Sequence, residues 1–303
     1  MTDEPTRCGF AAIVGAPNAG KSTLVNRLVG AKVAIVSPKV QTTRARVLGI
    51  GMDGATQIVW VDTPGIFAPR RRLERAMVAA AWKGAEDADV VVLLVDAIRG
   101  IDPDTRRIVE GLAAAGRRVW LALNKVDAVR PERLLPLAAE LAETGIFEET
   151  FMISALTGDG VERLAARVAE RMPEGPWLYP EDQVADMPQR LLAAEITREQ
   201  VFLQLHDELP YSVAVETETW EEHRDGSARI GQVIYVLRAS QKAIVLGKGG
   251  QRIKAISTAA RAEISRTLDR RVHLVLFVKE RPGWQDEREA YEAQGLEWEP
   301  GNG

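Results

Sequence analysis

Apolar and polar positions follow two different spacings in the first half of the chain. Uninterrupted apolar runs predict buried strands at 10–14, 90–95, 119–123 and 151–153. Apolar residues three and four positions apart predict helices at 22–29, 72–87, 103–115, 131–143 and 160–171. Strands that are apolar throughout and separated by helices are typical of a mostly parallel sheet with helices on both faces.

Two further apolar runs, at 47–50 and 57–61, lie on either side of Asp53-Gly54. An Asp-Gly pair between two such runs is a strong signal for a tight turn, because glycine tolerates a positive φ. We therefore expect a hairpin at this point of the chain.

The pattern changes at Met172. Three prolines within 173–180 exclude a continued helix and indicate a linker. Beyond it we expect a helix, two antiparallel strands, two helices and a strand, at 189–209, 211–220, 229–237, 242–246, 251–268 and 272–278. The predicted division is a first domain at 1–172, a linker at 173–188, a second domain at 189–283 and an acidic, loosely attached tail at 284–303.

Composition narrows the class of protein. The chain has 303 residues, and 46% of them are hydrophobic, which is enough to build the cores of two ordinary domains. A single cysteine, Cys8, rules out a disulfide framework and suits a reducing cytoplasm. The longest apolar run, at 90–95, is far too short to span a bilayer.

Charge is distributed unevenly. The formal net charge is −4, yet between Arg238 and Arg281 there are 11 basic residues against 3 acidic ones, a local excess of 11 − 3 = +8. A basic segment of this size in an acidic protein indicates a nucleic-acid-binding surface. The alternative is a basic face that only contacts solvent.

A short glycine-containing run follows the first predicted strand and fits the pattern of a phosphate-binding loop. Its residues are Gly15, Ala16, Pro17, Asn18, Ala19, Gly20, Lys21 and Ser22, and Thr23 comes next in the following helix. Gly15 and Gly20 allow the backbone to approach phosphates closely. Lys21 supplies a positive charge to the β- and γ-phosphates, and the Ser22 hydroxyl is a ligand for Mg²⁺.

Three later motifs follow in fixed order, each just after a predicted strand: Asp62-Thr63-Pro64-Gly65, Asn124-Lys125-Val126-Asp127 and Ser154-Ala155. Ligands of open α/β sheets bind at this end of the strands. We expect Asp62 to hold Mg²⁺ and Gly65 to offer its backbone N–H to the γ-phosphate.

The motif at 124–127 decides which base is bound. An ionised Asp127 only accepts hydrogen bonds, so it can take two from the guanine edge, and adenine does not present that pair of donors. Lys125 has a long apolar stem that can cover the base. Ser154-Ala155 would place a backbone N–H at the base oxygen. The ordered set of motifs therefore predicts a guanine-nucleotide site.

A threonine between 30 and 46 can bind Mg²⁺ only while the γ-phosphate is present, so this segment is expected to order with GTP and relax after hydrolysis. The candidates lie in Gln41-Thr42-Thr43-Arg44. We favour Thr43 and keep Thr42 as the alternative.

These residues resemble one family, the Era-type GTPases of the TrmE–Era group, over nearly the whole chain. The resemblance is carried by the phosphate loop, Gln41-Thr42-Thr43-Arg44, Asp62-Thr63-Pro64-Gly65-Ile66, the linker at 173–183 and Gly247-Lys248-Gly249-Gly250. It implies an α/β P-loop GTPase domain followed by an α+β type II KH domain. It also implies that the protein binds near the 3′ end of small-subunit (16S) rRNA and assists assembly of that subunit. Further expectations are a monomer in the cytoplasm and peripheral contact with a membrane.

The catalytic group is expected to be Lys21, Asn18, Thr43 and Gly65. Ile66 occupies the position where Ras-type enzymes carry the glutamine that orients water, so we expect slow intrinsic hydrolysis. In relatives of this type an asparagine at the position of Asn18 helps to bind K⁺, which implies stimulation by K⁺. The alternative is that Asn18 only makes hydrogen bonds within the loop.

KH domains clamp about four single-stranded nucleotides against a G-x-x-G loop. The RNA-binding residues that the resemblance implies here are Ile244, Gly247, Lys248, Gly249, Gly250, Arg252, Ile253 and Lys254. Ile244, Val245 and Ile253 are expected to form an apolar floor for the bases. A competing interpretation is a regulatory GTPase for RNA modification or a membrane, whose second domain binds something else. A metabolic kinase is a more remote one.

Overall fold

The computed structural model describes residues 5–205, 209–288, 291 and 296–298, and their contacts divide them into two units. The first unit holds 5–34, 43–186 and 296–298, and the second holds 35–42 and the remainder from Met187 onward. The short segment 35–42 thus belongs to the second unit although its neighbours on both sides belong to the first. Neither the sequence pattern nor the resemblance anticipates this assignment.

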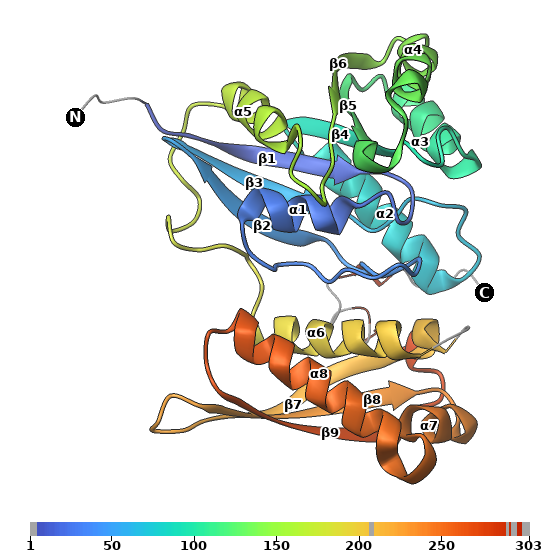
Figure 1. The fold of residues 1–303 in the computed structure, drawn as a ribbon, viewed down its shortest axis with the longest axis vertical. Coiled ribbons are helices and arrows are strands. Elements are labelled where there is room, and N and C mark those ends of the chain that lie inside the picture. Colours follow the sequence, from blue (N-terminus) through green and yellow to red (C-terminus); the bar gives the residue numbers. More distant parts are fainter. Residues whose placement is uncertain (1–4, 206–208, 289–290, 292–295, 299–303) are drawn as a thin grey trace. The chain divides into compact units, whose positions relative to one another are not determined.

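A six-stranded sheet forms the middle of the first unit, with the order β2-β3-β1-β4-β5-β6 (Figure 1). Its strands are β1 (Arg7–Val14), β2 (Val47–Asp53), β3 (Thr56–Asp62), β4 (Val90–Asp96), β5 (Val119–Asn124) and β6 (Phe147–Met152). All neighbours are parallel except β2 and β3, which form the hairpin predicted at Asp53-Gly54. The mostly parallel sheet is confirmed.

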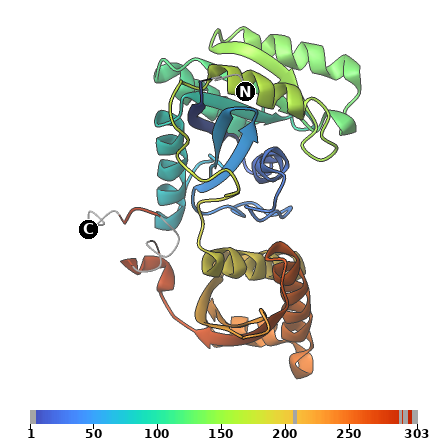
Figure 2. The ribbon, with the colours of Figure 1, turned by 90° about the vertical axis from the view of Figure 1, so that its left-hand side faces the viewer.

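Helices cover both faces of this sheet. On one face α2 (Arg72–Glu86), α3 (Pro103–Ala114) and α4 (Leu134–Ala142) bury apolar side chains in a common core with β1, β4 and β5. On the other face lie α1 (Lys21–Val29) and α5 (Val161–Arg171), which pack on β2 and β3. Figure 2 shows α1 and α2 on opposite sides of the strands.

The last strand of the sheet starts earlier than the apolar pattern predicts. β6 begins at Phe147 rather than at 151, and its side chains alternate between exposed and more buried positions. An edge strand with one solvated face alternates in this way, whereas the prediction looked for an uninterrupted apolar run. A 3₁₀ turn, η2 (Pro131–Arg133), likewise replaces the predicted first turn of α4.

The proline-rich segment after α5 forms no helix, as predicted, but it is fixed to the first unit. Gln57 on β3 is completely buried and holds it: its Oε1 accepts from the amides of Leu178 (2.9 Å) and Tyr179 (3.0 Å). Its Nε2 donates to the Tyr179 carbonyl at 2.8 Å. Residues 173–186 are therefore part of the first unit, and only the last two residues of the predicted linker, 187–188, lie in the second.

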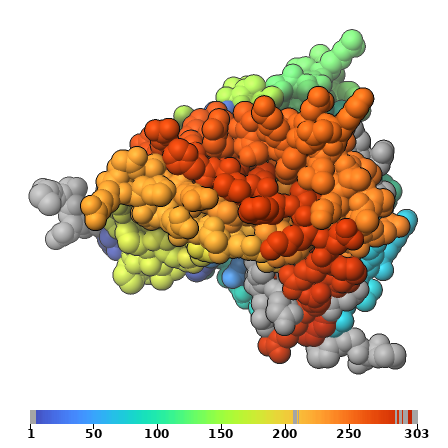
Figure 3. Space-filling model, turned by 90° about the horizontal axis from the view of Figure 1, so that it is seen from below, coloured from blue at the N-terminus to red at the C-terminus, as the bar shows by residue number. Residues whose placement is uncertain are grey.

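The second unit follows the predicted order of elements. Its members are α6 (Gln189–Gln204), η3 (Pro210–Ser212), β7 (Ala214–Glu222), β8 (Ala228–Val236), α7 (Ala239–Leu246), η4 (Lys248–Gly250), α8 (Gln251–Thr267), β9 (Val272–Glu280) and η5 (Trp284–Asp286). β8 pairs antiparallel with β7 and parallel with β9. α6 and α8 bury Ile196, Ala260 and Ile264 against Ile230 of β8. Figure 3 shows one face of this unit, and β9 and the segments around it form much of that face.

The segment after β9 is not loosely attached at its start, contrary to expectation. The Trp284 side chain is buried, and its Nε1 donates to the carbonyl of Ser212 at 3.3 Å. Most residues of the predicted tail beyond 288 lie outside the described part of the chain. Among the helices that the structure describes, none has the length and apolar character needed to cross a membrane.

Candidate guanine-nucleotide site and RNA-binding loop

The phosphate loop connects β1 to α1 and is closely packed from two sides. Gly20 has a φ of 100°, and a Cβ atom there would lie 2.4 Å from Asn124 Nδ2. A Cβ atom on Gly65 would lie 2.9 Å from Pro17 Cγ. Neither position can hold a larger residue without displacing a neighbour. The glycines at 20 and 65 are thus required by packing, which brings the second motif directly against the phosphate loop.

Lys21 opens α1 and is buried in this loop. Its Nζ donates to the carbonyls of Gly15 (3.1 Å) and Ala16 (3.0 Å). Burial lowers the pKa of Lys21 to about 8, and nearby Asp62 partly opposes this shift. An ammonium group held in this way gains from a phosphate charge, because its burial is otherwise only partly compensated.

Ser22, Thr43 and Asp62 form a compact cluster of oxygen atoms. Ser22 Oγ donates to Asp62 Oδ2 at 2.6 Å, Thr43 Oγ1 lies 3.3 Å from the same oxygen, and the two hydroxyls are 2.8 Å apart. Burial raises the pKa of Asp62 to about 6, while bonds from Ser22 and Thr43 and the charge of Lys21 lower it. Its other oxygen, Oδ1, is buried and has no hydrogen-bond partner among the described residues.

This cluster has the donor set that Mg²⁺ prefers, since hard divalent cations take hydroxyl and carboxylate oxygens. The unpartnered Oδ1 of Asp62 is the atom that a cation or its bound water would satisfy. The structure also distinguishes the two threonines. Thr42 Oγ1 bonds instead to Ser37 Oγ at 2.6 Å and to the Lys39 carbonyl at 2.7 Å. Only Thr43 reaches the cluster.

The third motif, at 124–127 after β5, contacts both the phosphate loop and the fourth motif. Asn124 Nδ2 donates to the Ala19 carbonyl at 2.8 Å, and its Oδ1 accepts from the Ala155 amide at 2.9 Å. Lys125 has a φ of 66° and directs its Nζ to the Asn18 carbonyl at 2.8 Å. Asp127 is exposed. Asn124 and Lys125 therefore bind the backbone of the phosphate loop, and the carboxylate of Asp127 is available to a ligand.

The predicted contact of the fourth motif with the base stays a prediction, and the amides of this motif have partners within the protein. The Ser154 amide donates to the Asp159 carbonyl at 2.9 Å, and the Ala155 amide is already bonded to Asn124. In this arrangement both amides have acceptors, so neither is directed solely at a base oxygen. The sequence pattern placed this motif correctly at the end of β6 but could not show how its amides are used.

The side chain of Ile66 confirms that it cannot orient water. It is buried in the core beneath the sheet, and its amide donates to the Gly15 carbonyl at 3.2 Å. Three residues of this site were missed by sequence reasoning. Asp96 bonds Lys125, Arg99 bonds the Pro17 carbonyl at 3.1 Å, and Asp102 pairs with Arg99. The available signal was the position of Asp96 at the end of an apolar strand.

In the second unit, the loop at 247–250 joins α7 to α8 and is open. Gly247, Gly249 and Gly250 all have positive φ, and a Cβ atom on Gly249 would meet nothing within 4 Å. The Lys248, Arg252 and Lys254 side chains around it are exposed. Cations beside an accessible glycine backbone suit a phosphodiester chain.

The apolar floor predicted beside this loop is only partly present. Ile244 is 46% exposed, and Ile253 is half-buried against the core of the unit. Val245 is wholly buried in that core, so the expectation that it contacts bases is wrong. Its position on α7, a helix that starts earlier than predicted, turns the side chain inward. On α8, Ile256, Ala260 and Ile264 are buried.

Comparisons with known proteins agree with this description. A family model described as 50S ribosome-binding GTPase matches residues 10–125, and one described as KH domain matches 208–285. GTPase Era of Rhizobium meliloti is 63% identical over 97% of this chain and 94% of its own length. GTPase Era of Caulobacter vibrioides is 55% identical over 99% of this chain and 100% of its own length.

Two solved structures are similar over nearly the whole chain. One is a variant of Aquifex aeolicus Era bound to GDP·AlF₄⁻, and the other is Era in complex with MgGDPNP and nucleotides 1506–1542 of 16S ribosomal RNA. Each has a TM-score of 0.90 and 38% sequence identity, and covers 96% of this chain and 99% of the other. Because GTPase Era of Rhizobium meliloti is 63% identical over nearly the whole chain, and both domains match in fold and order, the chain belongs to the Era family of GTPases.

Proposed function

We propose that this protein is a GTP-hydrolysing switch whose second domain binds the 3′ end of small-subunit rRNA and assists assembly of that subunit. The observation that carries the enzymatic part is the cluster of Ser22, Thr43 and Asp62 beside the buried Lys21. The RNA part rests on the open glycine loop at 247–250 and on the likeness to the Era structure that holds rRNA.

Different residues have different roles in binding and hydrolysing GTP. Lys21 carries positive charge to the β- and γ-phosphates, and Gly65 offers an amide to the γ-phosphate. Ser22, Thr43 and Asp62 would hold Mg²⁺, which when bound neutralises charge that develops on the phosphates. Asp127 selects guanine over adenine by accepting two hydrogen bonds. Because Ile66 lies in the core, no side chain at that position activates water, and intrinsic hydrolysis is slow.

A potassium ion is the further cofactor in this proposal, with Asn18 as one ligand. Asn18 is a non-glycine residue with a φ of 64°, a conformation that ordinary residues adopt rarely and that is often found at functional sites. The test compares GTP turnover in potassium and sodium buffers of equal ionic strength. Faster turnover in potassium, lost in Asn18→Ala, is expected. Equal rates in both salts would exclude the ion.

The experiment that tests the RNA part pairs two substitutions. Gly249→Asp places a carboxylate where phosphate is expected to bind. Gly226→Asp makes the same change in the turn between β7 and β8, where φ is also positive and the space is also open. We expect Gly249→Asp to abolish binding to rRNA 3′-end RNA, and Gly226→Asp to leave it nearly unchanged.

Both variants should keep the affinity for GDP, because the nucleotide site lies in the other unit. Undiminished RNA binding by Gly249→Asp would show that this loop is not the clamp. The same outcome would favour a GTPase whose second domain binds another ligand. The protein is expected to act in the cytoplasm as a monomer, and peripheral contact with a membrane rests on the family resemblance alone.

A further inference from the structure

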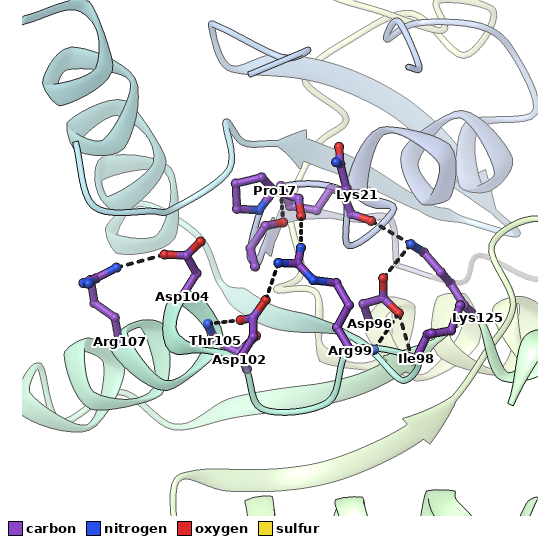
Figure 4. Close-up of polar contacts among 12 residues, drawn as sticks. Pro17, Lys21, Asp96, Ile98, Arg99, Asp102, Asp104, Thr105, Arg107 and Lys125 are labelled. Atoms are coloured by element: carbon purple, nitrogen blue, oxygen red, sulfur yellow. Dashed lines mark hydrogen bonds and ion pairs between the residues drawn. The ribbon is translucent and has the colours of Figure 1, made fainter. Parts of the chain in front are cut away.

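The turn that follows β4 lies against the phosphate loop. Figure 4 shows Arg99 of this turn directed at Pro17, where its Nη1 donates to the Pro17 carbonyl at 3.1 Å. The other arm of the guanidinium, Nη2, forms an ion pair with Asp102 Oδ2 at 2.8 Å. The guanidinium therefore connects the loop to Asp102 at the start of α3.

Asp102 is itself held in place. It caps α3, because its Oδ1 accepts from the Thr105 amide at 2.8 Å (Figure 4). Its side chain is only 13% exposed, compared with 46% for Arg99. One carboxylate thus fixes a helix terminus with one oxygen and Arg99 with the other, so that the guanidinium has a rigid support.

The bond to Pro17 acts on the part of the loop whose conformation is least ordinary. A peptide unit is planar and trans, so fixing the Pro17 carbonyl also fixes the direction of the Asn18 N–H on the other side of the plane. Asn18 has a φ of 64°, and its own carbonyl accepts from Lys125. Gly65 packs against the ring of Pro17. Pro17 therefore lies between Arg99 and the motif expected to contact the γ-phosphate.

We propose that Arg99, supported by Asp102, is a positioning residue of the nucleotide site, which fixes the Pro17–Asn18 peptide and so slows release of guanine nucleotides. This inference rests on the proposed function of the phosphate loop. Arg99 belongs to none of the sequence motifs, and within the described residues its hydrogen bond to the loop is the one to the Pro17 carbonyl. Its effect should reach GDP and GTP alike, since the loop binds phosphates common to both, and should leave the choice of base unchanged.

A second arginine–aspartate pair on α3 provides the control. Arg107 Nη1 lies 2.9 Å from Asp104 Oδ1, with the same spacing of three residues and an Arg107 exposure of 47% (Figure 4). No bond from Arg107 to the phosphate loop accompanies this pair within the described structure. If Arg99 served only as a surface ion pair at the start of α3, the two arginines would behave alike.

The experiment measures dissociation of fluorescent GDP and of a fluorescent non-hydrolysable GTP analogue from the full chain after mixing with excess unlabelled nucleotide. Arg99→Ala should release both about tenfold faster, the effect of losing one charge-assisted hydrogen bond. Arg99→Lys should recover part of the loss, and Asp102→Asn, which keeps the cap but loses the charge, should lie between. Arg107→Ala should match the wild type.

Thermal unfolding without nucleotide separates positioning from stability, because Arg99→Ala and Arg107→Ala should shift the midpoint by similar small amounts. Release from Arg99→Ala at the rate of Arg107→Ala would overturn the inference while leaving the nucleotide site intact. Preference of Arg99→Ala for adenine nucleotides would also overturn it. Failure of the wild-type protein to bind GDP would instead overturn the proposed function, and this inference with it.

Discussion

Two glycine loops in this molecule precede helices and are expected to contact phosphates, yet they are built in opposite ways. The loop at 15–22 is enclosed by Asn124, Gly65 and Arg99, and its lysine is buried. The loop at 247–250 is accessible, with exposed cations around it. The first is preorganised for one small ligand of fixed shape, which suits catalysis. The second presents its backbone to a polymer that approaches from solvent.

The largest contrast should come from adding the same methyl group to each loop. In Gly20→Ala the new Cβ would lie 2.4 Å from Asn124 Nδ2, so the Asn124 side chain or the loop must move. GDP affinity should fall by about a hundredfold, because buried hydrogen bonds that hold the loop are lost at a cost of about 1 to 3 kcal/mol each. Gly249→Ala should only lower the free energy of unfolding, by about 1 kcal/mol, because a residue with a Cβ atom is disfavoured at a positive φ. Isothermal titration measures the GDP affinity of both variants, and denaturant unfolding measures their stability. Equal losses of GDP affinity in Gly20→Ala and Gly249→Ala would contradict the difference proposed between the two loops.

The next effect concerns the base. Asp127→Asn replaces an acceptor by a group that also donates, and should lower GTP affinity by about a hundredfold because guanine N–H groups lose their partner. A nucleotide whose purine has a carbonyl in place of the 2-amino group should bind more tightly to the variant than to the wild-type protein. Competition against fluorescent GDP measures this change of preference. Unaltered selectivity would mean that Asp127 does not contact the base.

Several features of the fold and of the site could be predicted from the sequence. The hairpin at Asp53-Gly54 and the position of each motif at a strand end follow from local turn chemistry and from short-range periodicity. Sequence reasoning favours Thr43 over Thr42 as the Mg²⁺ ligand, but only the fold shows that these adjacent hydroxyls have different partners. Arg99 escaped notice because its target, Pro17, is 82 residues away and is contacted through a carbonyl, which every residue has.

The burial of Val245 and the attachment of the linker could not be predicted from periodicity. Val245 was assigned to the surface because helical spacing alone does not tell which side of a short helix faces the sheet. The linker was predicted from its prolines, but its attachment depends on Gln57, a polar residue in an apolar strand. A buried glutamine is a signal that sequence reasoning could have used, since a buried amide needs partners.

A moderate loss of stability is expected from Gln57→Leu, which removes three hydrogen bonds to residues 178 and 179. The free energy of unfolding of the first unit should fall by about 3 kcal/mol, near 1 kcal/mol for each bond. Gln183→Leu is the matched control, because within the described residues its side chain makes one hydrogen bond, from Nε2 to the Ala185 carbonyl. Urea unfolding followed by tryptophan fluorescence measures both. Equal stabilities would mean that the linker is not held through Gln57.

The smallest effect should come from a single exposed cation beside the open loop. Lys254→Ala should weaken RNA binding a few-fold and reduce the slope of log affinity against log salt by about 1. Arg163→Ala, an exposed cation on α5 in the first unit, should change neither quantity. A salt slope that is the same in both variants would place the RNA elsewhere on the surface.

Whether this protein is a GTP-dependent rRNA-binding switch is decided by the affinity of the wild-type protein, loaded with a GTP analogue or with GDP, for RNA of the small-subunit 3′-end sequence and for a shuffled RNA of equal length. We expect the analogue-loaded protein to bind the 3′-end sequence about tenfold more tightly than the shuffled RNA, because KH domains read the bases of single-stranded RNA. Equal, weak binding of both RNAs in both nucleotide states would contradict it and leave a GTPase whose second domain serves another ligand.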